Sequence, residues 1–328
     1  MKVLNGDGFL EVTDRKKARK DGMVAAILEK TNIPKMCRVI QKFDNFHLSN
    51  IEGNLIDGLQ RQGTLDKIRP GQSIAVTAGS RGIANIALIT LTVIKEIKRM
   101  GANPFIIPTM GSHGGSLAEG QVKILENYGI TEKTMGCPIC ATMDTVQVGV
   151  SEYGLPVNID KYACQADGIV VICRVKSHTA FRGKYESGLL KMITIGLGKQ
   201  KGAEICHAQG FGNMERNIVA NSKTILANCK VLFGVASIEN AYDETRRIAV
   251  VPAEKFFEEE PYLLEEAKEN MPSILIKEFD VLIIDESGKN ISGDGMDPNI
   301  TGNFCTQYAS GGAVKQRTVL LDLTEESY

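Results

Sequence analysis

The 328-residue chain carries 38 basic and 39 acidic residues, a formal net charge of −1, together with 43% hydrophobic residues and 33 glycines. This balance excludes the basic surface that binds nucleic acid or an anionic membrane, so we expect neither partner. The length is sufficient for two domains, and the glycine content is typical of an α/β protein with many tight turns.

The N-terminal residues 1–22 lack the apolar core of a secretory signal, and no apolar run is long enough to span a bilayer. We therefore expect a cytoplasmic protein whose eight cysteines are reduced thiols, several of them buried. Cys137 and Cys140 form the one CxxC pattern. Such a pair can be redox-active or half of a zinc site, but no second CxxC supplies further ligands. We interpret it as two thiols in a turn beside Pro138.

Hydrophobic periodicity divides the first half of the chain into strands and helices. Short apolar runs bounded by turn residues predict strands, and apolar residues at helical spacing predict helices. In chain order these are a helical stretch at residues 23–29, a strand at 37–43, a helix at 50–62, a strand at 73–80, a helix at 83–100, a strand at 104–108 and a helix at 117–128. This alternation predicts a parallel, Rossmann-like sheet with right-handed crossovers.

The second half continues the alternation and then changes character. It predicts short strands and turns at residues 137–163, a strand at 167–175, a helix at 214–228, a strand at 229–239, a charged helix at 253–270 and strands at 279–286 and 317–323. We therefore predict an α/β domain at residues 1–252, a helical connector at 253–272 and the start of a smaller α/β domain at 273–328. Two strands are few for such a domain, so we expect the sequence to contain only part of it.

Three polar loops follow predicted strands and contain candidate site residues. They are residues 79–82 with Arg81, residues 111–115 with His113, and the loop that contains His178. Because the carboxyl ends of parallel strands lie at one edge of a sheet, these side chains are expected to converge. One histidine in a loop is weak evidence of catalysis, but three of the four histidines follow predicted strands. We interpret the fourth, His47, as structural.

Residues 168–207 hold the densest group of candidates. A buried strand leads to His178, then to Lys191 in the apolar stretch SGLLKMITIGL, and then to His207. Histidine binds metals and transfers protons near neutral pH. A lysine among apolar residues is either paired, used covalently, or placed at the surface with its stem on apolar neighbours. The combination indicates chemistry more than packing.

Two glycine-rich stretches have alternative interpretations. Gly111, Gly114 and Gly115 flank His113 and would let backbone amides approach an anion, or form a tight turn into a helix. The stretch GLGKQKG at residues 196–202 matches neither the GxGxxG nor the P-loop pattern, and we predict a turn there.

At these residues the chain resembles the nickel-pincer lactate racemase family, from about Ile74 to its end. Members of that family carry a strand-end arginine, a glycine-flanked histidine, a histidine followed by SGxxK, and a further histidine. The matching residues here are Arg81, His113, His178, Ser187 to Lys191, and His207, which follows Lys191 by sixteen positions.

The resemblance implies a nickel-dependent racemase or epimerase of a 2-hydroxy acid. Its cofactor, the nickel-pincer nucleotide, is a pyridinium mononucleotide that would be tethered to Lys191 by a thioamide, with His207 as the nickel ligand. Ser80, Ser187 and Gly188 would contact the cofactor. The resemblance also implies partner enzymes that assemble the cofactor, so recombinant protein made without them would lack it. Assembly into a homo-oligomer is compatible with the sequence.

The resemblance further implies a division of roles around the substrate. His113 and His178 would face opposite sides, each as the base for one stereoisomer, and Arg81 would bind the carboxylate. One histidine would take the hydroxyl proton while hydride leaves C2 for the cofactor.

The chain departs from lactate racemases in the substrate pocket. The loop before Arg81 reads TAGS without an acidic residue, and Asp297-Pro298-Asn299 is followed by Thr301 and Gly302, with no lysine at the expected place. We therefore expect retained cofactor chemistry and a substrate larger than lactate.

Two other functions fit the same residues. His113, His178 and His207 could form the zinc triad of a hydrolase or lyase. The fold could also bind a small molecule or metallocofactor without turnover.

Overall fold

The computed structural model describes residues 27, 29–32, 35–80 and 82–327, and the chain divides into two units, Met1–Gln41 and Lys42–Tyr328. The helical stretch predicted at residues 23–29 falls mainly outside the described residues. The strand predicted at residues 37–43 is wrong, because these residues form no regular structure. Their alternation of apolar residues is not matched by burial, since Val39 is 60% and Ile40 70% exposed.

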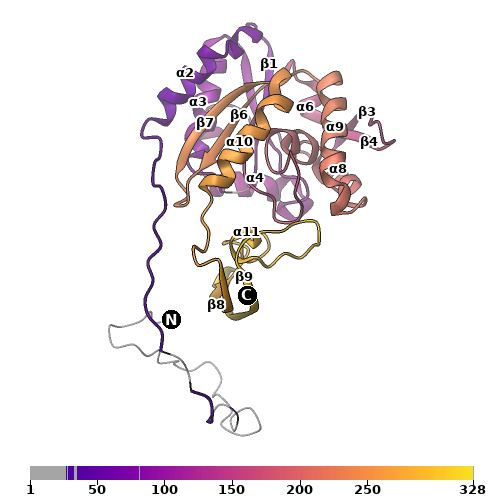
Figure 1. The fold of residues 1–328 in the computed structure, drawn as a ribbon. Helices are drawn as coiled ribbons and strands as arrows, with labels where there is room; N and C mark the ends of the chain where they lie inside the picture. Colours follow the sequence, from indigo (N-terminus) through magenta and orange to yellow (C-terminus); the bar gives the residue numbers. More distant parts are fainter. Residues whose placement is uncertain (1–26, 28, 33–34, 81, 328) are drawn as a thin grey trace. The chain divides into compact units, whose positions relative to one another are not determined.

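A five-stranded sheet forms the centre of the second unit (Figure 1). Its strands, in spatial order, are β2 (Asn103–Pro108), β1 (Ser73–Ala78), β5 (Gly168–Arg174), β6 (Val231–Glu239) and β7 (Thr245–Pro252). The first four are mutually parallel, and β7 pairs antiparallel with β6. The predicted α/β fold class with a parallel sheet is confirmed. The sequence analysis missed β7, which returns from β6 through a short turn with Asp243 at positive φ.

Helices cover both faces of this sheet. They are α2 (Ile51–Arg61), α3 (Ile86–Arg99), α4 (Ala118–Asn127), α5 (Glu132–Met135), α6 (Lys161–Gln165), α7 (Leu189–Lys191), α8 (Lys199–His207), α9 (Met214–Asn228) and α10 (Phe256–Asn270). The helices predicted at residues 50–62, 83–100, 117–128 and 214–228 are confirmed within a few residues at each end. The stretch predicted as a turn at residues 196–202 is wrong, because α8 begins within it.

The two faces of the sheet separate the core into two layers because successive strand residues point to opposite sides. Val170 and Ile172 of β5 pack with α2 and α3, whereas Val171 and Cys173 pack with α7, α9 and α10. Strands buried on both faces are nearly continuous apolar runs, and this is why the sequence pattern identified them.

The chain runs from β1 to β2 on one side and later to β5 on the other, so the connections diverge between β1 and β5. Ligands bind at such switch points, beyond the carboxyl ends of the strands. This edge therefore positions the candidate site.

Two smaller sheets complete the second unit. β3 (Thr145–Val150) and β4 (Pro156–Asp160) form an antiparallel hairpin, and β8 (Glu278–Ser287) pairs parallel with β9 (Val314–Leu323). A short helix, α11 (Pro298–Thr301), lies between β8 and β9 in the sequence. The predicted strands in this part are confirmed, whereas the domain boundaries at residues 252 and 272 stay a prediction. In the described part of the chain, no helix is both long and apolar enough to cross a membrane.

Candidate active site

The loops that follow β1 and β2 meet the turn that follows Lys191. This turn, Met192–Gly196, is a π-helical stretch between α7 and α8, a geometry that is often found at functional sites. A Cβ placed on Gly79 would lie 3.3 Å from Met192 Cε, and one on Gly111 would lie 3.5 Å from the Ile195 carbonyl oxygen. The structure therefore brings the predicted loops together. Arg81 lies outside the described residues.

His113 contacts Ser80 from the neighbouring strand end. The Ser80 Oγ and the His113 Nδ1 are 2.5 Å apart, and the Tyr128 hydroxyl donates to the Ser80 carbonyl at 2.6 Å. The sequence analysis predicted that Ser80 contacts the cofactor. In the structure its side chain contacts His113, a candidate catalytic residue. The contact orients the His113 ring through its Nδ1 atom.

The backbone of the His113 loop depends on glycine. Gly114 and Gly115 have φ values of 69° and 66°, which residues with a side chain rarely adopt. A Cβ on Gly120 of α4 would lie 2.0 Å from the Gly114 carbonyl oxygen. Residue 120 must therefore be glycine for α4 to pack this closely against the loop. The tight turn into a helix is confirmed.

A buried ion pair lies beneath this loop and was missed by the sequence analysis. Lys199 and Asp160 are both fully buried, with Lys199 Nζ 2.9 Å from Asp160 Oδ2. Lys199 Nζ also donates to the Pro108 carbonyl at the end of β2 and, at 3.4 Å, to Gln121. The Gln121 amide in turn donates to the carbonyls of Gly111, at 3.0 Å, and of His113, at 3.2 Å. Burial lowers the pKa of Lys199, and the Asp160 carboxylate opposes that shift.

His178 lies in the loop after β5, with its ring held from both sides. The Ala180 amide donates to His178 Nδ1 at 3.0 Å, and the ring lies on Phe181 with 4.3 Å between centroids. Burial, followed by the positive charges of Lys191 and Lys176, lowers the pKa of His178 to about 2. The imidazole is therefore neutral.

Arg182 and Glu186, which the sequence analysis missed, hold this loop. Arg182 donates to the His178 carbonyl at 2.6 Å, to Asn299 Oδ1 at 2.5 Å and to the Ser310 carbonyl at 2.9 Å. The buried Glu186 accepts the His178 amide at 2.7 Å and pairs with Lys268 at 3.3 Å. The sequence around Arg182 and Glu186 did not indicate their structural role, because several of their partners are far away in the sequence.

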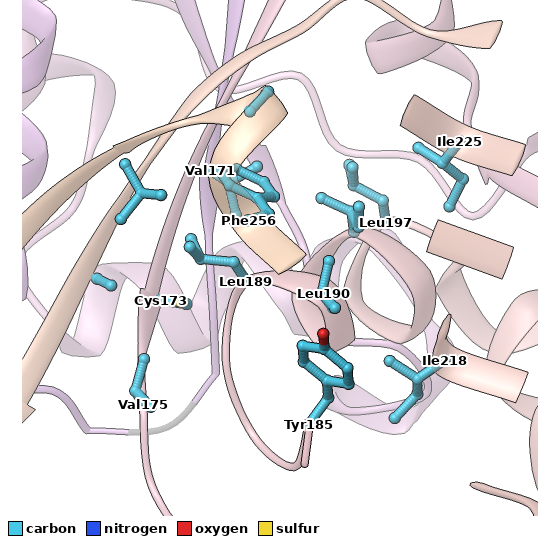
Figure 2. Close-up of a cluster of buried hydrophobic side chains, with 14 of the residues drawn as sticks. Val171, Cys173, Val175, Tyr185, Leu189, Leu190, Leu197, Ile218, Ile225 and Phe256 are labelled. Atoms are coloured by element: carbon cyan, nitrogen blue, oxygen red, sulfur yellow. The ribbon is translucent and has the colours of Figure 1, made fainter. Parts of the chain in front are cut away.

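The residues before Lys191 anchor it in the core. Figure 2 shows Leu189 and Leu190 among the apolar side chains between β5 and α9, and both are fully buried. The carboxylate of the buried Glu260 in α10 accepts a hydrogen bond from the Leu190 amide at 2.9 Å. A Cβ on Gly188 would lie only 2.7 Å from the Glu260 Cδ atom. Gly188 therefore has a packing reason to be glycine. Ser187 closes the loop by backbone hydrogen bonds with Lys176, at 3.1 and 3.3 Å.

His207 is the last residue of α8 and is exposed, with its ring 5.7 Å from that of Phe211. Desolvation and the Lys191 ammonium lower its pKa. Because Lys191 acts on both His178 and His207, these three residues lie in one neighbourhood. The structure thus brings together the three candidates of the central window.

The described residues do not support a zinc triad of His113, His178 and His207 or a reactive thiol at Cys137 and Cys140. No group of three His, Cys, Asp or Glu side chains among them is placed to hold a metal ion, so His113, His178 and His207 do not form a triad here. Burial raises the pKa of Cys137 to about 11, and burial also raises the pKa of Cys140 above its ordinary value. The Cys140 amide donates to the Ile106 carbonyl at 2.8 Å, so this segment extends the sheet beside β2.

A cavity of about 430 Å³ lies beyond the carboxyl ends of β5 and β6, at the edge of the sheet from which the His178 loop extends. Its lining includes Arg174, Lys176, Glu239, Met271 and Asp297, and none of the predicted site residues that the structure describes. Of its charged groups, Arg174 pairs with Glu239 and Lys176 with Asp297, and Asp243 and Glu286 also line it. Because none of the candidate histidines lines this cavity, it is a weaker candidate for their chemistry.

Comparison with known proteins decides the family. Residues 50–218, more than half of the chain, match the family model for the lactate racemase N-terminal domain. The chain belongs to the lactate racemase family. A solved structure, the lactate racemase apoprotein from Thermoanaerobacterium thermosaccharolyticum, matches with a TM-score of 0.53 and 15% sequence identity. The match covers 73% of this chain and 59% of that one, and it supports the fold. Comparison with curated proteins gives no match.

The lactate racemase match includes every predicted site residue, from Ser80 to His207. The partners of Arg182 at Asn299 and Ser310 lie beyond it. The family match therefore covers the loops after β1, β2 and β5, whereas two of the groups that Arg182 binds come from the rest of the chain.

Proposed function

We propose that this chain catalyses racemisation or epimerisation of a 2-hydroxy acid with a nickel-pincer nucleotide held on Lys191. The observation that carries the proposal is the position of Lys191, close enough to His178 and His207 to lower the pKa of both. This group lies beyond the carboxyl ends of the strands, at the site where α/β sheets bind ligands.

The residues present suit that cofactor. Lys191 would carry the covalent tether, and His207, exposed and kept neutral, has the imidazole form that binds a metal. When bound, the cofactor supplies an acceptor for the hydride that leaves C2.

The side chains around the substrate would act on its oxygen atoms. His113 and His178, on the loops after β2 and β5, would contact the hydroxyl group and handle its proton. Arg81 would bind the carboxylate through paired hydrogen bonds. Ser80 would orient His113 through the contact to Nδ1.

The substrate is proposed to be a 2-hydroxy acid larger than lactate. Asp297 pairs with Lys176 at 3.3 Å, and Asn299 accepts from Arg182 at 2.5 Å. These residues bind the protein's own loop, and Thr301 and Gly302 follow them without a lysine. A pocket with fewer polar groups from this segment favours a longer side chain on the acid.

The test uses protein produced together with cofactor-assembly enzymes and a panel of enantiopure 2-hydroxy acids. We expect loss of optical rotation for one class of acid, and in D₂O the product should keep its original hydrogen at C2. Lys191→Arg should abolish the reaction, whereas Lys201→Arg, on the exposed side of α8, should not. Loaded protein that racemises no acid would sink the proposal, and solvent deuterium at C2 would exclude hydride transfer.

A further inference from the structure

The cavity of about 430 Å³ adjoins the His178 loop. Val175 and Lys176 line it, and His178 follows Lys176 by two positions, which separates the two residues by at most about 7 Å along the backbone. The cavity also lies beyond the carboxyl ends of β5 and β6, where open α/β sheets bind ligands. A molecule held at His178 is therefore within reach of the cavity.

One wall of the cavity is joined to the His178 loop by polar contacts. Asp297, which precedes α11, lines the cavity and pairs with Lys176 at 3.3 Å. Asn299 of α11 accepts a hydrogen bond from Arg182 at 2.5 Å, and Arg182 also donates to the His178 carbonyl. These contacts fix the distance between the cavity wall and the histidine.

The cavity wall is mostly apolar. The end of α10 contributes Met271, β8 contributes Leu282 and Ile284, and the segment that leads into α11 contributes Met296 and Ile300. All five side chains are half-buried, so they keep some contact with water that a bound apolar group would remove. The walls therefore favour a hydrocarbon group.

The charged groups of the cavity discriminate between classes of 2-hydroxy acid. Among the described residues, its cations and carboxylates are Arg174, Lys176, Glu239, Asp243, Glu286 and Asp297. Both cations form ion pairs within this set, so carboxylates are in excess. A dicarboxylic acid would place its second negative charge near this excess, and a sugar acid would place hydroxyl groups against apolar walls. An acid with one carboxylate and an apolar side chain fits best.

We propose that this cavity binds the side chain of the substrate and makes the enzyme selective for a 2-hydroxy acid with an aryl or branched alkyl group. The inference rests on the proposed function, which defines the side chain only as larger than that of lactate. The carboxylate and the hydroxyl group lie at the histidines, and the apolar group enters the cavity beside Lys176. Leu282, Ile284 and Ile300 then determine selectivity, because they form the apolar wall.

The first test measures binding, by ¹³C NMR of protein labelled at the methionine methyl groups and produced together with the cofactor-assembly enzymes. Excess 3-phenyllactate should shift the signals of Met271 and Met296, because an aromatic ring in the cavity changes the shielding of methyl groups beside it. Lactate and malate at the same concentration should not shift them. Met135 is the internal control, since it is buried in the core and does not line the cavity. Unshifted Met271 and Met296 signals with 3-phenyllactate would overturn the inference.

The second test fills the cavity. Ile284 lines it, whereas the neighbouring Ile283 is 55% exposed on the other face of β8, so the same substitution at the two positions gives a matched pair. Ile284→Phe should lower kcat/KM for 3-phenyllactate by about 10- to 200-fold and change that for lactate by less than about threefold. Ile283→Phe should change neither. Equal losses for the two acids, or no loss with 3-phenyllactate, would contradict the proposed selectivity.

The proposed function and the cavity assignment fail separately. Wild-type protein that racemises neither acid would defeat the proposed function, and the methionine signals would still show whether the cavity binds the apolar group. The same signals decide the assignment if Ile284→Phe does not fold.

Discussion

The loops after β2 and β5 each present a histidine at the same edge of the sheet, but different forces hold them. The loop after β2 is shaped by its backbone, through glycines at positive φ and carbonyls bound by Gln121. Its foundation is the buried Lys199 pair. The loop after β5 is held by side chains, because Arg182 and Glu186 bind its carbonyl and amide groups.

This difference has a consequence for the two histidines. Ser80 and Gln121, which contact the His113 loop, lie within the stretch that matches the lactate racemase domain. The His178 loop depends also on Asn299 and Ser310, more than a hundred positions later in the chain. Changes in the C-terminal segment should therefore affect His178 and leave His113 in place.

The largest expected effect tests the foundation of the His113 loop. Lys199→Met leaves Asp160 buried without its partner, so the free energy of unfolding should fall by about 3–5 kcal/mol in urea titrations. Lys201→Met is the matched control on the exposed side of the same helix and should change it by less than about 0.5 kcal/mol. A decrease in the free energy of unfolding of less than about 1 kcal/mol for Lys199→Met would show that the ion pair does not stabilise the fold beneath the loop.

On the other side, Glu260 behind Gly188 should make stability depend on pH. Burial raises its pKa to about 7 from 4.5, so between these values the folded chain holds a proton that the unfolded chain has lost. The free energy of unfolding should therefore decrease as pH rises across this window, by on the order of 3 kcal/mol from this group. Glu260→Gln should flatten that decrease in denaturant titrations from pH 4 to pH 8. An unchanged slope would show that Glu260 titrates normally.

Arg182→Gln should separate the two loops most clearly. The loss of charge-assisted bonds should destabilise the chain by about 1–3 kcal/mol. In hydrogen exchange, the His178 amide should lose protection, whereas the His113 amide, bonded to the Met110 carbonyl, should keep it. Equal loss of protection at both amides would contradict the separate support of the loops.

The smallest effect is expected from Ser80→Ala. Its partly exposed hydroxyl contacts His113 Nδ1, so its removal should cost less than about 1 kcal/mol and should alter the His113 ring signals in NMR. The His178 signals should stay as in the wild type, and Ser112→Ala should leave both unchanged. A shift of the His178 signals would mean that the two rings are coupled.

The sequence predicted those parts of the fold in which buried residues produce a regular pattern of apolar side chains. The strands β1, β5 and β6 are apolar on both faces, and α3 repeats its apolar residues at helical spacing. Residues 37–43 have the same alternation without burial, so the pattern alone was misleading there. The start of α8 was hidden by its glycines and by Lys199, whose positive φ and full burial follow from tertiary contacts.

The candidate site was predictable where residues follow strand ends. The loops of His113 and His178 lie at one edge because parallel strands end there, a rule that needs only the order of elements. Lys191 and His207 follow in helices α7 and α8. Arg182, Glu186 and Gln121 were not predictable, because each acts through partners that only the folded chain brings near. The different hydrogen-bond partners of the His113 and His178 Nδ1 atoms were also not predictable from the sequence.

The mass of the Lys191 peptide, measured in protein produced together with the cofactor-assembly enzymes, tests the proposed function most directly. The account predicts a covalent adduct on Lys191, one nickel per chain, and loss of both in Lys191→Arg. A lactate racemase produced in the same host serves as the positive control. Unmodified Lys191 in cells where that control is modified would contradict the account.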